Sequence, residues 1–595
     1  MKRFSKIFLA LLLTFSLSAC NKQNSSDQKA MQDKFDQFIE QEFIDTLESS
    51  YISLHSFIEK PEDFNIDINK VDIGFGSGYS EAELQEAKEI TEKTANQFDE
   101  FDRDLLTASQ QETYDIYQQS IEIAQKLNDD KYLYLTPVFQ SATGDHCQIP
   151  TLLTDWIVRN EQDVKDLITL VNDTDRYFQS LLDYVKVQAK KETLSINIDE
   201  VVTYCNGIVE KGNDSPILSS MLNKIDALTI DDSLKTDYKQ QLTNAFNQSF
   251  IPAYQNIIDT LSSLDQSKIN NQGLANLENG KEYYQLLLQN MTASDKTVPQ
   301  IQEEIETAME DTLQQMQTLI ISNPSLMSVY QNNFQNVKTN YNDYQQIIDD
   351  LASKIKDDFP DIGTIDYQVA AIDPSLANDS VAAYYNLPAL DSTTPNQIRV
   401  NSNNNEIDLR DVDTYQTIGH EGMPGHMYQV NYSYQNLDNN YRKILAQNSA
   451  YQEGWAVYVQ YYINKYLSDQ INSDTLELMK YNNICSYYAM ILCDIGIHYE
   501  NWDLDDFEEN LNDFGFVIND KDALKSQYNQ LKDNPGIFIP YYYGYLQFSN
   551  LETKAKEALN NKFNDKDFHE ALLKSGSASF EIVARNVDEY IQKEK

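Results

Sequence analysis

Two histidines flank a short stretch of turn-forming residues at positions 420–426, which read His-Glu-Gly-Met-Pro-Gly-His. Zinc peptidases commonly carry two histidines four positions apart on a helix, because that spacing places both imidazoles on one face and the intervening glutamate beside the metal's water. Here the second histidine follows after six positions, and six steps of about 100° would put it on the far side of a regular helix. Pro424 and Gly425 disfavour regular helix, so we expect a distortion that brings His426 back beside His420. Without that distortion, the two histidines would be ordinary surface residues.

A single carboxylate lies within the apolar stretch that follows. Glu453 is the only charged residue between Lys443 and Lys465. Burying a glutamate in an apolar helix is costly unless a cation or a metal pairs with it. Glu453 comes 27 residues after His426, which is far enough for a second helix to return beside the first. We therefore predict Glu453 as a third metal ligand that leaves a fourth position for water, the alternative being an exposed or lysine-paired glutamate.

A second apolar stretch carries an aspartate and a histidine one helical turn apart. Asp494 is the only formally charged residue between Lys480 and Glu500, and His498 follows it at a spacing of four. On a helix this spacing places both side chains on one face, where the carboxylate can orient the imidazole and favour its protonated form. The pair could serve beside the metal or form a hydrogen bond in the core, and the spacing does not separate these two interpretations.

The rest of the chain predicts a large helical scaffold that must hold these residues. Its 595 residues include 18 glycines and 14 prolines, so turn residues are scarce and long helices are expected. Apolar residues recur at spacings of three and four, with acids and amides between them, over residues 31–58, 81–128, 161–192, 233–264 and 297–357. We expect amphipathic helices over these ranges, with their charged residues on solvated faces.

The pattern changes near Phe359, where proline and glycine become more frequent. Short segments bounded by turn residues predict strands at 382–390, 398–401 and 407–409. From about Thr414 to the end the pattern is helical again. We therefore divide the mature chain into a helical scaffold region over residues 31–358 and a catalytic region over 359–595. In the second region a small sheet precedes the metal-binding helix.

The N-terminus has the form of an export signal. A basic start precedes an apolar run over residues 7–17 and small residues before Cys20. The run is too short to span a bilayer, and the whole is similar to a bacterial lipoprotein signal, in which the new N-terminal cysteine receives lipid. We predict a signal peptide at 1–19, lipidation of Cys20 and a polar tether over 20–30, with an uncleaved anchor helix as the alternative. The protein would then be extracytoplasmic and lipid-anchored to the bacterial cell membrane.

Four further cysteines, at positions 147, 205, 485 and 493, lack the C-x-x-C spacing of a metal site. In an exported protein they could pair in any of three ways or remain buried thiols.

The overall charge excludes another class of function. With 46 basic and 93 acidic residues the net charge is −47, a field that repels phosphate backbones, so we expect no nucleic-acid partner.

The motifs together resemble the domain of unknown function 885 family, bacterial proteins regarded as zinc-peptidase-like. The matching pieces are H-E-G-M-P-G-H from His420, E-G-W-A-V-Y from Glu453, D-I-G-I-H-Y-E-N-W from Asp494, P-G-I-F-I-P-Y-Y-Y-G from Pro535 and F-H-x-x-L-x-x-x-G from Phe568. Weaker similarity upstream extends the resemblance over nearly the whole mature chain. It implies a mainly α fold, a large multi-helix zincin-like scaffold with a small β-sheet before the metal-binding helix.

Position by position, the resemblance also implies functional residues. By this resemblance the zinc ligands would be His420, His426 and Glu453. Glu421 would be the acid/base residue, and Tyr541 and His498 would be candidates to donate a hydrogen bond to the developing oxyanion. The chain departs from the family pattern at Met427, Gln460, Tyr487, Met490 and Ile537. None of these departures removes a predicted ligand, but they weaken any substrate preference taken from the family.

From these residues we expect a zinc-dependent (Zn2+) metallopeptidase that hydrolyses peptide substrates outside the cytoplasm. Zinc would polarise the scissile carbonyl and lower the pKa of its water, and Glu421 would accept that water's proton and pass it to the leaving amine. Two alternatives remain, a non-catalytic peptide-binding lipoprotein and a zinc amidohydrolase acting on cell-wall peptides. The sequence does not distinguish cleavage within a peptide from cleavage at its end, and it leaves the oligomeric state open.

Overall fold

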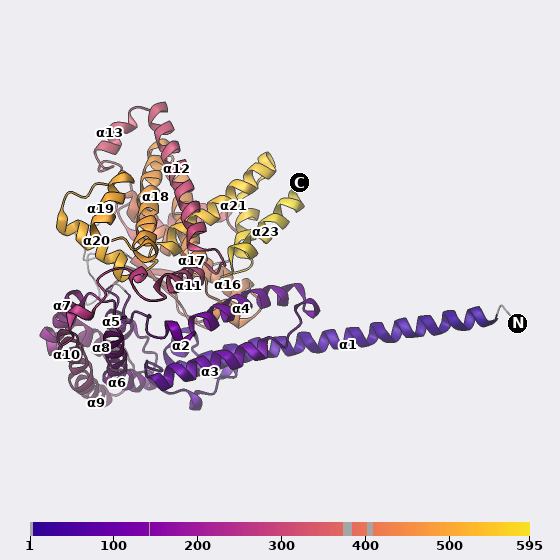
Figure 1. The fold of residues 1–595 in the computed structure, drawn as a ribbon, viewed down its shortest axis with the longest axis horizontal. Helices are drawn as coiled ribbons and strands as arrows, with labels where there is room; N and C mark the ends of the chain where they lie inside the picture. Colours follow the sequence, from indigo (N-terminus) through magenta and orange to yellow (C-terminus); the bar gives the residue numbers. More distant parts are fainter. Residues whose placement is uncertain (1–3, 142, 373–382, 402–407) are drawn as a thin grey trace.

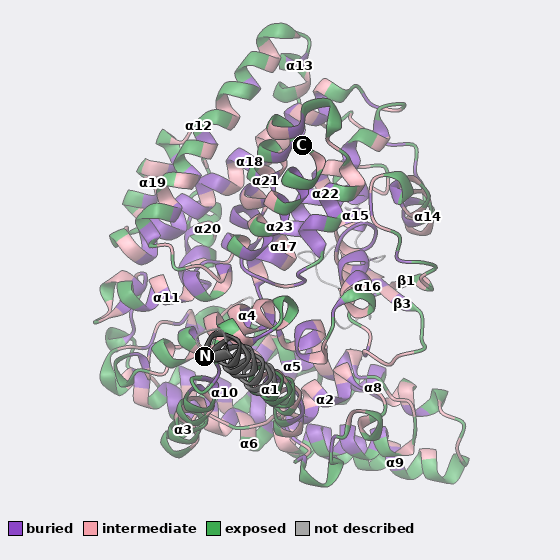
Figure 2. Cartoon of the chain, turned by 90° about the vertical axis from the view of Figure 1, so that its right-hand side faces the viewer, coloured by how far each residue is buried: buried purple, intermediate pink, exposed green. Residues whose placement is uncertain are grey.

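The protein is built mainly of helices arranged in two layers (Figure 1), with a small sheet at one side of the molecule (Figure 2). The computed structural model describes residues 4–141, 143–372, 383–401 and 408–595, with side chains described from residue 27 onward. Helices from the first half of the chain form one layer, and those from the second half form the other.

Among the described residues, the N-terminal layer contains ten α-helices and most of one buried core, which includes Phe178 and Tyr254. They are α1 (Phe4–Ser49), α2 (Tyr51–Phe57), α3 (Glu81–Phe98), α4 (Ala108–Leu127), α5 (Asp145–Asp155), α6 (Glu161–Lys191), α7 (Ile198–Lys211), α8 (Pro216–Ala227), α9 (Asp232–Ala245) and α10 (Ile251–Ser262). The predicted helix over 81–128 is two helices. Ser80 and Thr107 each begin a helix with a capping box, in which the cap side chain accepts from the backbone N–H of the third helical residue and the side chain of that residue accepts from the backbone N–H of the cap.

The C-terminal layer contains the predicted metal-site residues. Its helices are α11 (Gly280–Thr292), α12 (Val298–Ser322), α13 (Leu326–Gln331), α14 (Tyr344–Lys354), α15 (Val412–Glu421), α16 (His426–Asn436), α17 (Ser449–Tyr462), α18 (Ser473–Ile495), α19 (Leu504–Asp513), α20 (Lys521–Asp533), α21 (Gly544–Leu559), α22 (Asp565–Leu573) and α23 (Phe580–Glu594). Helices α11 to α14, which the sequence placed with the scaffold region, share buried clusters with the helices that follow residue 412.

Helix α17 lies at the centre of this layer, and Figure 2 shows it as mostly buried. Its Trp455 is fully buried, and its Gly454 lies against Gly544 at the start of α21. A Cβ atom on Gly454 would come within 2.4 Å of the backbone of Gly544, so the two helices can approach this closely only without side chains at the crossing. The tight crossing fixes the level at which Glu453, the preceding residue, projects from α17.

A three-stranded sheet precedes α15, as the sequence predicted, but its strands differ from those expected. The strands are β1 (Tyr367–Ala371), β2 (Ala383–Asn386) and β3 (Asn396–Val400) in the order β1-β3-β2, with β1 parallel and β2 antiparallel to the central β3. Strands β2 and β3 fall on the first two predicted segments, whereas β1 was missed. In the third, residue 407 lies outside the described residues, and 408–409 do not form a strand.

The cysteines and the N-terminal segment bear on export. Cys205, Cys485 and Cys493 are buried thiols, and the thiol of Cys147 lies 2.9 Å from the carbonyl oxygen of Gly144 as a hydrogen-bond donor. Helix α1 runs through the predicted tether and projects from the body (Figure 1), while the side chain of Cys20 lies outside the described residues. Within the part of the chain that was described, none of the helices is both long and apolar enough to cross a membrane.

Candidate metal centre

The stretch from His420 to His426 is a break between two helices. Helix α15 ends at Glu421, where the N–H of Gly422 donates to the carbonyl of Ile418 at 2.9 Å, and α16 begins at His426. The expected distortion is therefore present, and the second histidine starts a new helix. The indole N–H of Trp455 on α17 donates to the carbonyl of Pro424 at 3.0 Å, which fixes the bend against the helix that carries Glu453.

This bend brings the three predicted ligands together. Their ligand atoms all lie within 4.8 Å of one another. The Nε2 atom of His420 is 3.6 Å and that of His426 is 3.3 Å from Oε2 of Glu453. Zinc bonds of about 2.1 Å at tetrahedral angles place neighbouring ligand atoms about 3.4 Å apart, so the donor set and its spacing fit a zinc ion.

The charges of this cluster are mutually dependent. Burial alone would raise the pKa of Glu453, but the charges and hydrogen bonds of His426 and His420 outweigh it, and the pKa lies well below the usual range. Burial likewise would lower the pKa of His426, but the adjacent Glu453 carboxylate outweighs it and the pKa is raised. Glu453 is therefore paired with imidazoles and not with a lysine, the partner that the alternative interpretation required.

Glu421 lies beside the three ligands but is held differently. Its Oε1 atom is 4.0 Å from Nε2 of His420, and its Oε2 atom accepts a hydrogen bond from the backbone N–H of Tyr385 at 2.8 Å. Tyr385 belongs to the edge strand β2, so the sheet orients this carboxylate. One oxygen is fixed by the strand, and the other is turned toward the ligand cluster.

Gln460 is a site residue that the sequence showed only as a departure from the family pattern. Its Oε1 atom accepts a hydrogen bond from Nδ1 of His420 at 3.1 Å. An amide oxygen can only accept, so Nδ1 donates to Gln460, and Nε2 is the ring nitrogen that faces the ligand cluster. Gln460 follows Glu453 by seven positions, two turns along α17, and this spacing could have indicated that both residues share one face of the helix.

Tyr541 lies at the same site, as predicted. It belongs to the helical turn η13 (Ile539–Tyr543), and its ring is stacked near that of His420 with centroids 6.4 Å apart. Burial, together with the charges of Glu453 and Glu421, raises the pKa of its hydroxyl, which therefore stays protonated and can donate. One cavity of about 830 Å³ is lined by Tyr541 together with His420, Glu421, His426 and Glu453.

His498 does not lie with these residues. It is fully buried in another part of the layer, where its Nδ1 atom accepts from the N–H of Leu274 at 3.1 Å and its Nε2 atom lies 3.1 Å from the carbonyl of Leu531. Burial lowers the pKa of His498 to about 4, so it is neutral and not the protonated imidazole that the spacing suggested. Its Nε2 atom is 3.7 Å from Asp494, which instead accepts from Tyr284 and from the N–H of Gly536.

The closing motif of the family resemblance also lies in the core. His569 is fully buried, its ring is stacked on Phe359 with centroids 4.1 Å apart, and its Nδ1 atom lies 2.7 Å from the carbonyl of Asp358. This contact ties α22 to the segment that leads into the sheet. The motif therefore helps to build the scaffold behind the metal-site helices, since Trp455 packs edge-on against the same ring.

Comparison of the whole fold finds similar solved structures at low sequence identity. One is a "putative lipoprotein" from Colwellia psychrerythraea (16% identity, TM-score 0.80, 95% of this chain and 99% of the other). Another is a "putative lipoprotein of unknown function" from Shewanella oneidensis (14% identity, TM-score 0.63, 93% and 99%). A "putative peptidase" from Chlamydophila abortus matches with a TM-score of only 0.34 at 14% identity over 86% and 89%, too low to support an argument.

At these identities the structural matches show the shared fold alone. None of the curated proteins is significantly similar in sequence to this chain. The sequence model of one family, described as bacterial protein of unknown function (DUF885), matches residues 75–587. Because this match covers most of the chain, the protein belongs to that family.

Proposed function

We propose that this protein is a zinc-dependent hydrolase of peptide bonds. The observation that carries the proposal is the convergence of His420, His426 and Glu453, with a fourth group, Glu421, held beside them by the sheet. Three protein ligands are typical of catalytic zinc sites, which keep a position open, whereas structural sites usually have four. All four side chains line a cavity, so a substrate can reach them.

His420, His426 and Glu453 would hold the ion, and Gln460 would keep the Nε2 atom of His420 available for it. A bound zinc ion supplies Lewis-acid chemistry, which activates water and polarises a carbonyl oxygen at neutral pH. The buried position of Trp455 behind the bend would keep the two imidazoles in a fixed arrangement.

Glu421 would act as the general base and then as the general acid. Its Oε2 atom is held by the N–H of Tyr385, and its Oε1 atom remains to take a proton from the attacking water and deliver it to the leaving amine nitrogen. A carboxylate that was itself a ligand could not do this as readily. The 4.0 Å separation between Oε1 and His420 suits a group one hydrogen bond away from the ion's position.

Tyr541 would donate its hydroxyl proton in a hydrogen bond to the carbonyl oxygen as negative charge develops there. Its raised pKa keeps the hydroxyl a donor throughout. We assign His498 no part in the reaction, because both of its ring nitrogens bond to backbone groups in the core.

The edge strand β2 would align the substrate. Residues 383–385 line the cavity, and among the described residues β2 pairs with β3 on one side only; on its other side the N–H of Tyr385 donates to Glu421, so this edge faces the site. An extended peptide can bind to such an edge through main-chain hydrogen bonds. The protein would act outside the cytoplasm, attached by lipid on Cys20, a location consistent with the lipoprotein names of two structural neighbours.

The test is metal analysis of the purified protein combined with digestion of a peptide library, followed by mass spectrometry. We expect about one zinc per chain and cleavage that falls about 10²- to 10⁴-fold in Glu421→Gln while the zinc content stays unchanged. Glu500→Gln is the matched control, since Glu500 is an exposed acid on another element, and it should retain zinc and activity.

Other outcomes would separate the alternatives. Zinc without cleavage of any amide would indicate a binding protein, and cleavage confined to cell-wall peptides would indicate the amidohydrolase. Absence of both zinc and cleavage would refute the proposal, and full activity in Glu421→Gln would remove Glu421 as the base.

A further inference from the structure

The cavity at the metal centre has walls of unusual composition for so acidic a protein. Its apolar wall residues come from several elements: Phe57, Ala383, Leu387, Val430, Ile444 and Leu445. Its uncharged polar wall residues are glutamines and tyrosines: Gln429, Gln447, Gln452, Tyr384, Tyr385 and Tyr541. Its remaining members are the four groups of the metal centre. Among the residues that the structure describes, Glu421 and Glu453 are the only acids that line it.

No lysine or arginine lines this cavity among the residues that the structure describes. The undescribed segments on either side of β2 and β3, residues 373–382 and 402–407, contain neither residue type in their sequence. Arg399 lies opposite Tyr384 in the sheet, but it donates to the carbonyl of Ala371 at 3.5 Å and is not part of the cavity wall. Apart from the proposed metal ion, the described wall therefore offers no cation to a peptide's terminal carboxylate.

An amino terminus also lacks a dedicated partner. Recognition of an ammonium group in a desolvated site requires an acceptor or an acid free to pair with it. The two acids of the cavity belong to the metal cluster, where Glu453 pairs with both histidines and Glu421 accepts from the strand. Among the described wall residues, neither end of a peptide thus finds an opposite charge outside the metal cluster.

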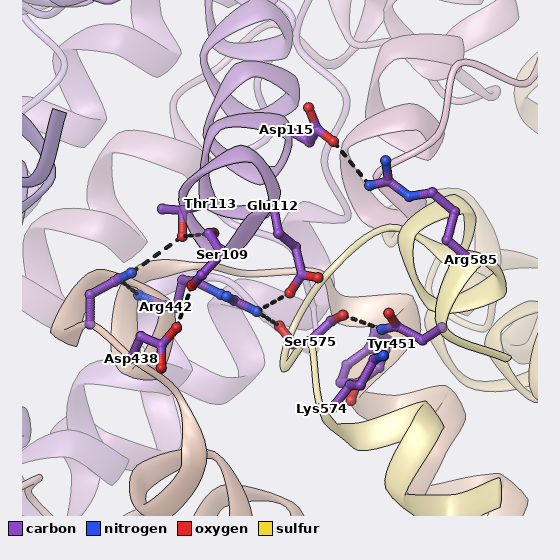
Figure 3. Close-up of polar contacts among 12 residues, drawn as sticks. Ser109, Glu112, Thr113, Asp115, Asp438, Arg442, Tyr451, Lys574, Ser575 and Arg585 are labelled. Carbon is purple, nitrogen blue, oxygen red and sulfur yellow. Dashed lines mark hydrogen bonds and ion pairs between the residues drawn. The ribbon is translucent and has the colours of Figure 1, made fainter. Parts of the chain in front are cut away.

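The apolar part of the wall is firmly built. Ile444 and Leu445 lie on the helical turn η10 (Tyr441–Leu445), which Arg442 anchors. Arg442 is 5% exposed; it pairs with Glu112 of α4 and donates to the carbonyl of Ser575 at 2.6 Å, as Figure 3 shows. These contacts join both layers of the fold at the turn, so the apolar wall is held from two sides.

The remaining apolar residues face the same space from other elements. Val430 follows His426 by one turn of α16, which places both on the face toward the cavity. Phe57 ends α2 of the N-terminal layer, and its carbonyl accepts from the N–H of Leu390 at 2.8 Å, just beyond β2. Leu387 is 38% exposed, a large apolar side chain available to a ligand.

We propose that the cavity accepts an internal segment of a peptide chain, with an uncharged, apolar side chain next to the bond that is cleaved. This inference rests on the proposed hydrolase function and makes the protein an endopeptidase. Burying a charged side chain or a free terminus here would leave that charge unpaired, whereas an apolar side chain gains from leaving water. The apolar wall could accept this side chain from either side of the cleaved bond.

The experiment compares peptides of one sequence in three forms: capped at both ends, with a free carboxylate, and with a free amino terminus. The residue varied next to the cleaved bond is Leu, Asp or Lys. We expect the zinc-loaded protein to cleave the capped Leu peptide at least about tenfold faster, in kcat/KM, than the Asp or Lys forms, with no gain from freeing either end. A tenfold gain on freeing one end, or equal cleavage of the three residues, would overturn the inference.

A binding measurement separates this inference from the proposed function. The zinc-loaded Glu421→Gln protein should bind the capped Leu peptide at least about tenfold more tightly than its free-carboxylate form. If no peptide is cleaved by the wild type, the hydrolase proposal fails, and this comparison alone then decides the inference. Equal affinity, or tighter binding of the free carboxylate, would overturn it.

Variants of the wall give the matched comparison. Leu445→Asp places a carboxylate in the apolar wall, and Ile321→Asp places one on an exposed, 78% accessible position of α12. We expect Leu445→Asp to lower kcat/KM for the capped Leu peptide at least tenfold and to lower it less for the Lys peptide, with Ile321→Asp unchanged. Unchanged selectivity in a folded Leu445→Asp protein would contradict the assignment of the wall.

Discussion

Gly425→Ala perturbs the bend that places the two histidines, and its consequence follows from the local geometry. A Cβ atom at Gly425 would lie 1.8 Å from the carbonyl oxygen of His420 and 2.6 Å from that of Gly419. Real Cβ atoms keep at least about 3.0 Å, so the backbone on the two sides of the bend must separate by about 1.2 Å. Both contacts are with backbone atoms, which cannot turn aside as a flexible side chain could.

That displacement exceeds what the proposed metal centre can absorb. Zinc–ligand distances vary by only about 0.2 Å among functional sites, whereas the methyl group pushes directly on the residue that carries one ligand. We expect zinc affinity to fall at least about 100-fold, by analogy with the 10- to 100-fold losses from disturbing groups that merely support ligands. Overpacking of this kind also lowers the free energy of unfolding by about 1–3 kcal/mol.

The assay is a zinc titration against a chelator of known affinity, together with urea unfolding of the same samples. Gly207→Ala is the matched control, because Gly207 lies inside α7 and a Cβ atom there would meet nothing within 4 Å. That substitution should leave zinc affinity unchanged and raise stability by up to about 1 kcal/mol, since alanine favours helix. A folded Gly425→Ala protein with wild-type zinc affinity would refute the role given to the bend.

Three further predictions concern single side chains. Gln460→Leu should weaken zinc binding about 10- to 100-fold in a chelator titration, since Nδ1 of His420 loses its acceptor; unchanged affinity would argue against that role. Tyr541→Phe should lower kcat about 10²-fold at unchanged zinc content, and wild-type kcat would exclude the hydroxyl from oxyanion binding. Burial raises the pKa of Asp494 from 3.8 to about 7, so its stabilising contribution is complete below about pH 4 and is lost as pH rises toward 7. The stability of wild type relative to Asp494→Asn should therefore fall by about 1.4 kcal/mol per pH unit across this window in urea unfolding, and a pH-independent difference would contradict the shift.

The sequence predicted helices well where apolar periodicity was long and uninterrupted. Helix α6 (Glu161–Lys191) matches its predicted range almost residue for residue, because its buried face recurs at helical spacing along its whole length. The predicted helix over 297–357 contains three helices in the structure. Periodicity averages over such breaks, since the residues on either side of a turn remain apolar wherever they pack against the same core.

Strand β1 was missed for a different reason. Its residues, Tyr367–Ala371, alternate weakly in burial and pair in parallel with β3, which lies about 25 residues later in sequence. A parallel partner leaves no hairpin signal in the sequence, so nothing local marks the segment as a strand. The antiparallel strand β2 was easier to predict because it contains two tyrosines and is followed by a proline.

The same difference between local and long-range sequence information decides which site residues could be predicted. His420, Glu421, His426 and Glu453 were predictable because their chemistry requires particular residue types at a limited spacing, here on the consecutive helices α15, α16 and α17. The prediction of Tyr541 rested on the family resemblance alone. Tyr541 is far from the other site residues in sequence, so its spacing from them does not indicate that they lie close together in space. The backbone N–H of Tyr385 could not have been predicted, because a main-chain donor has no residue type and its position depends on the register of the sheet.

Asp494 and His498 show where local reasoning gave the wrong electrostatics. Their spacing correctly placed them on one helical face, and a protonated imidazole seemed to follow from an adjacent carboxylate. In the structure, desolvation decides both pKa values in the direction of neutrality, raising that of Asp494 and lowering that of His498. The oxygens of Asp494 accept hydrogen bonds from Gly536 and Tyr284, donors that lie 42 and 210 residues away in sequence. Burial of that kind is a property of the folded chain, and no spacing between two residues can report it. Spacing along a helix can therefore identify which groups share a face, while their protonation depends on what the rest of the fold places against that face.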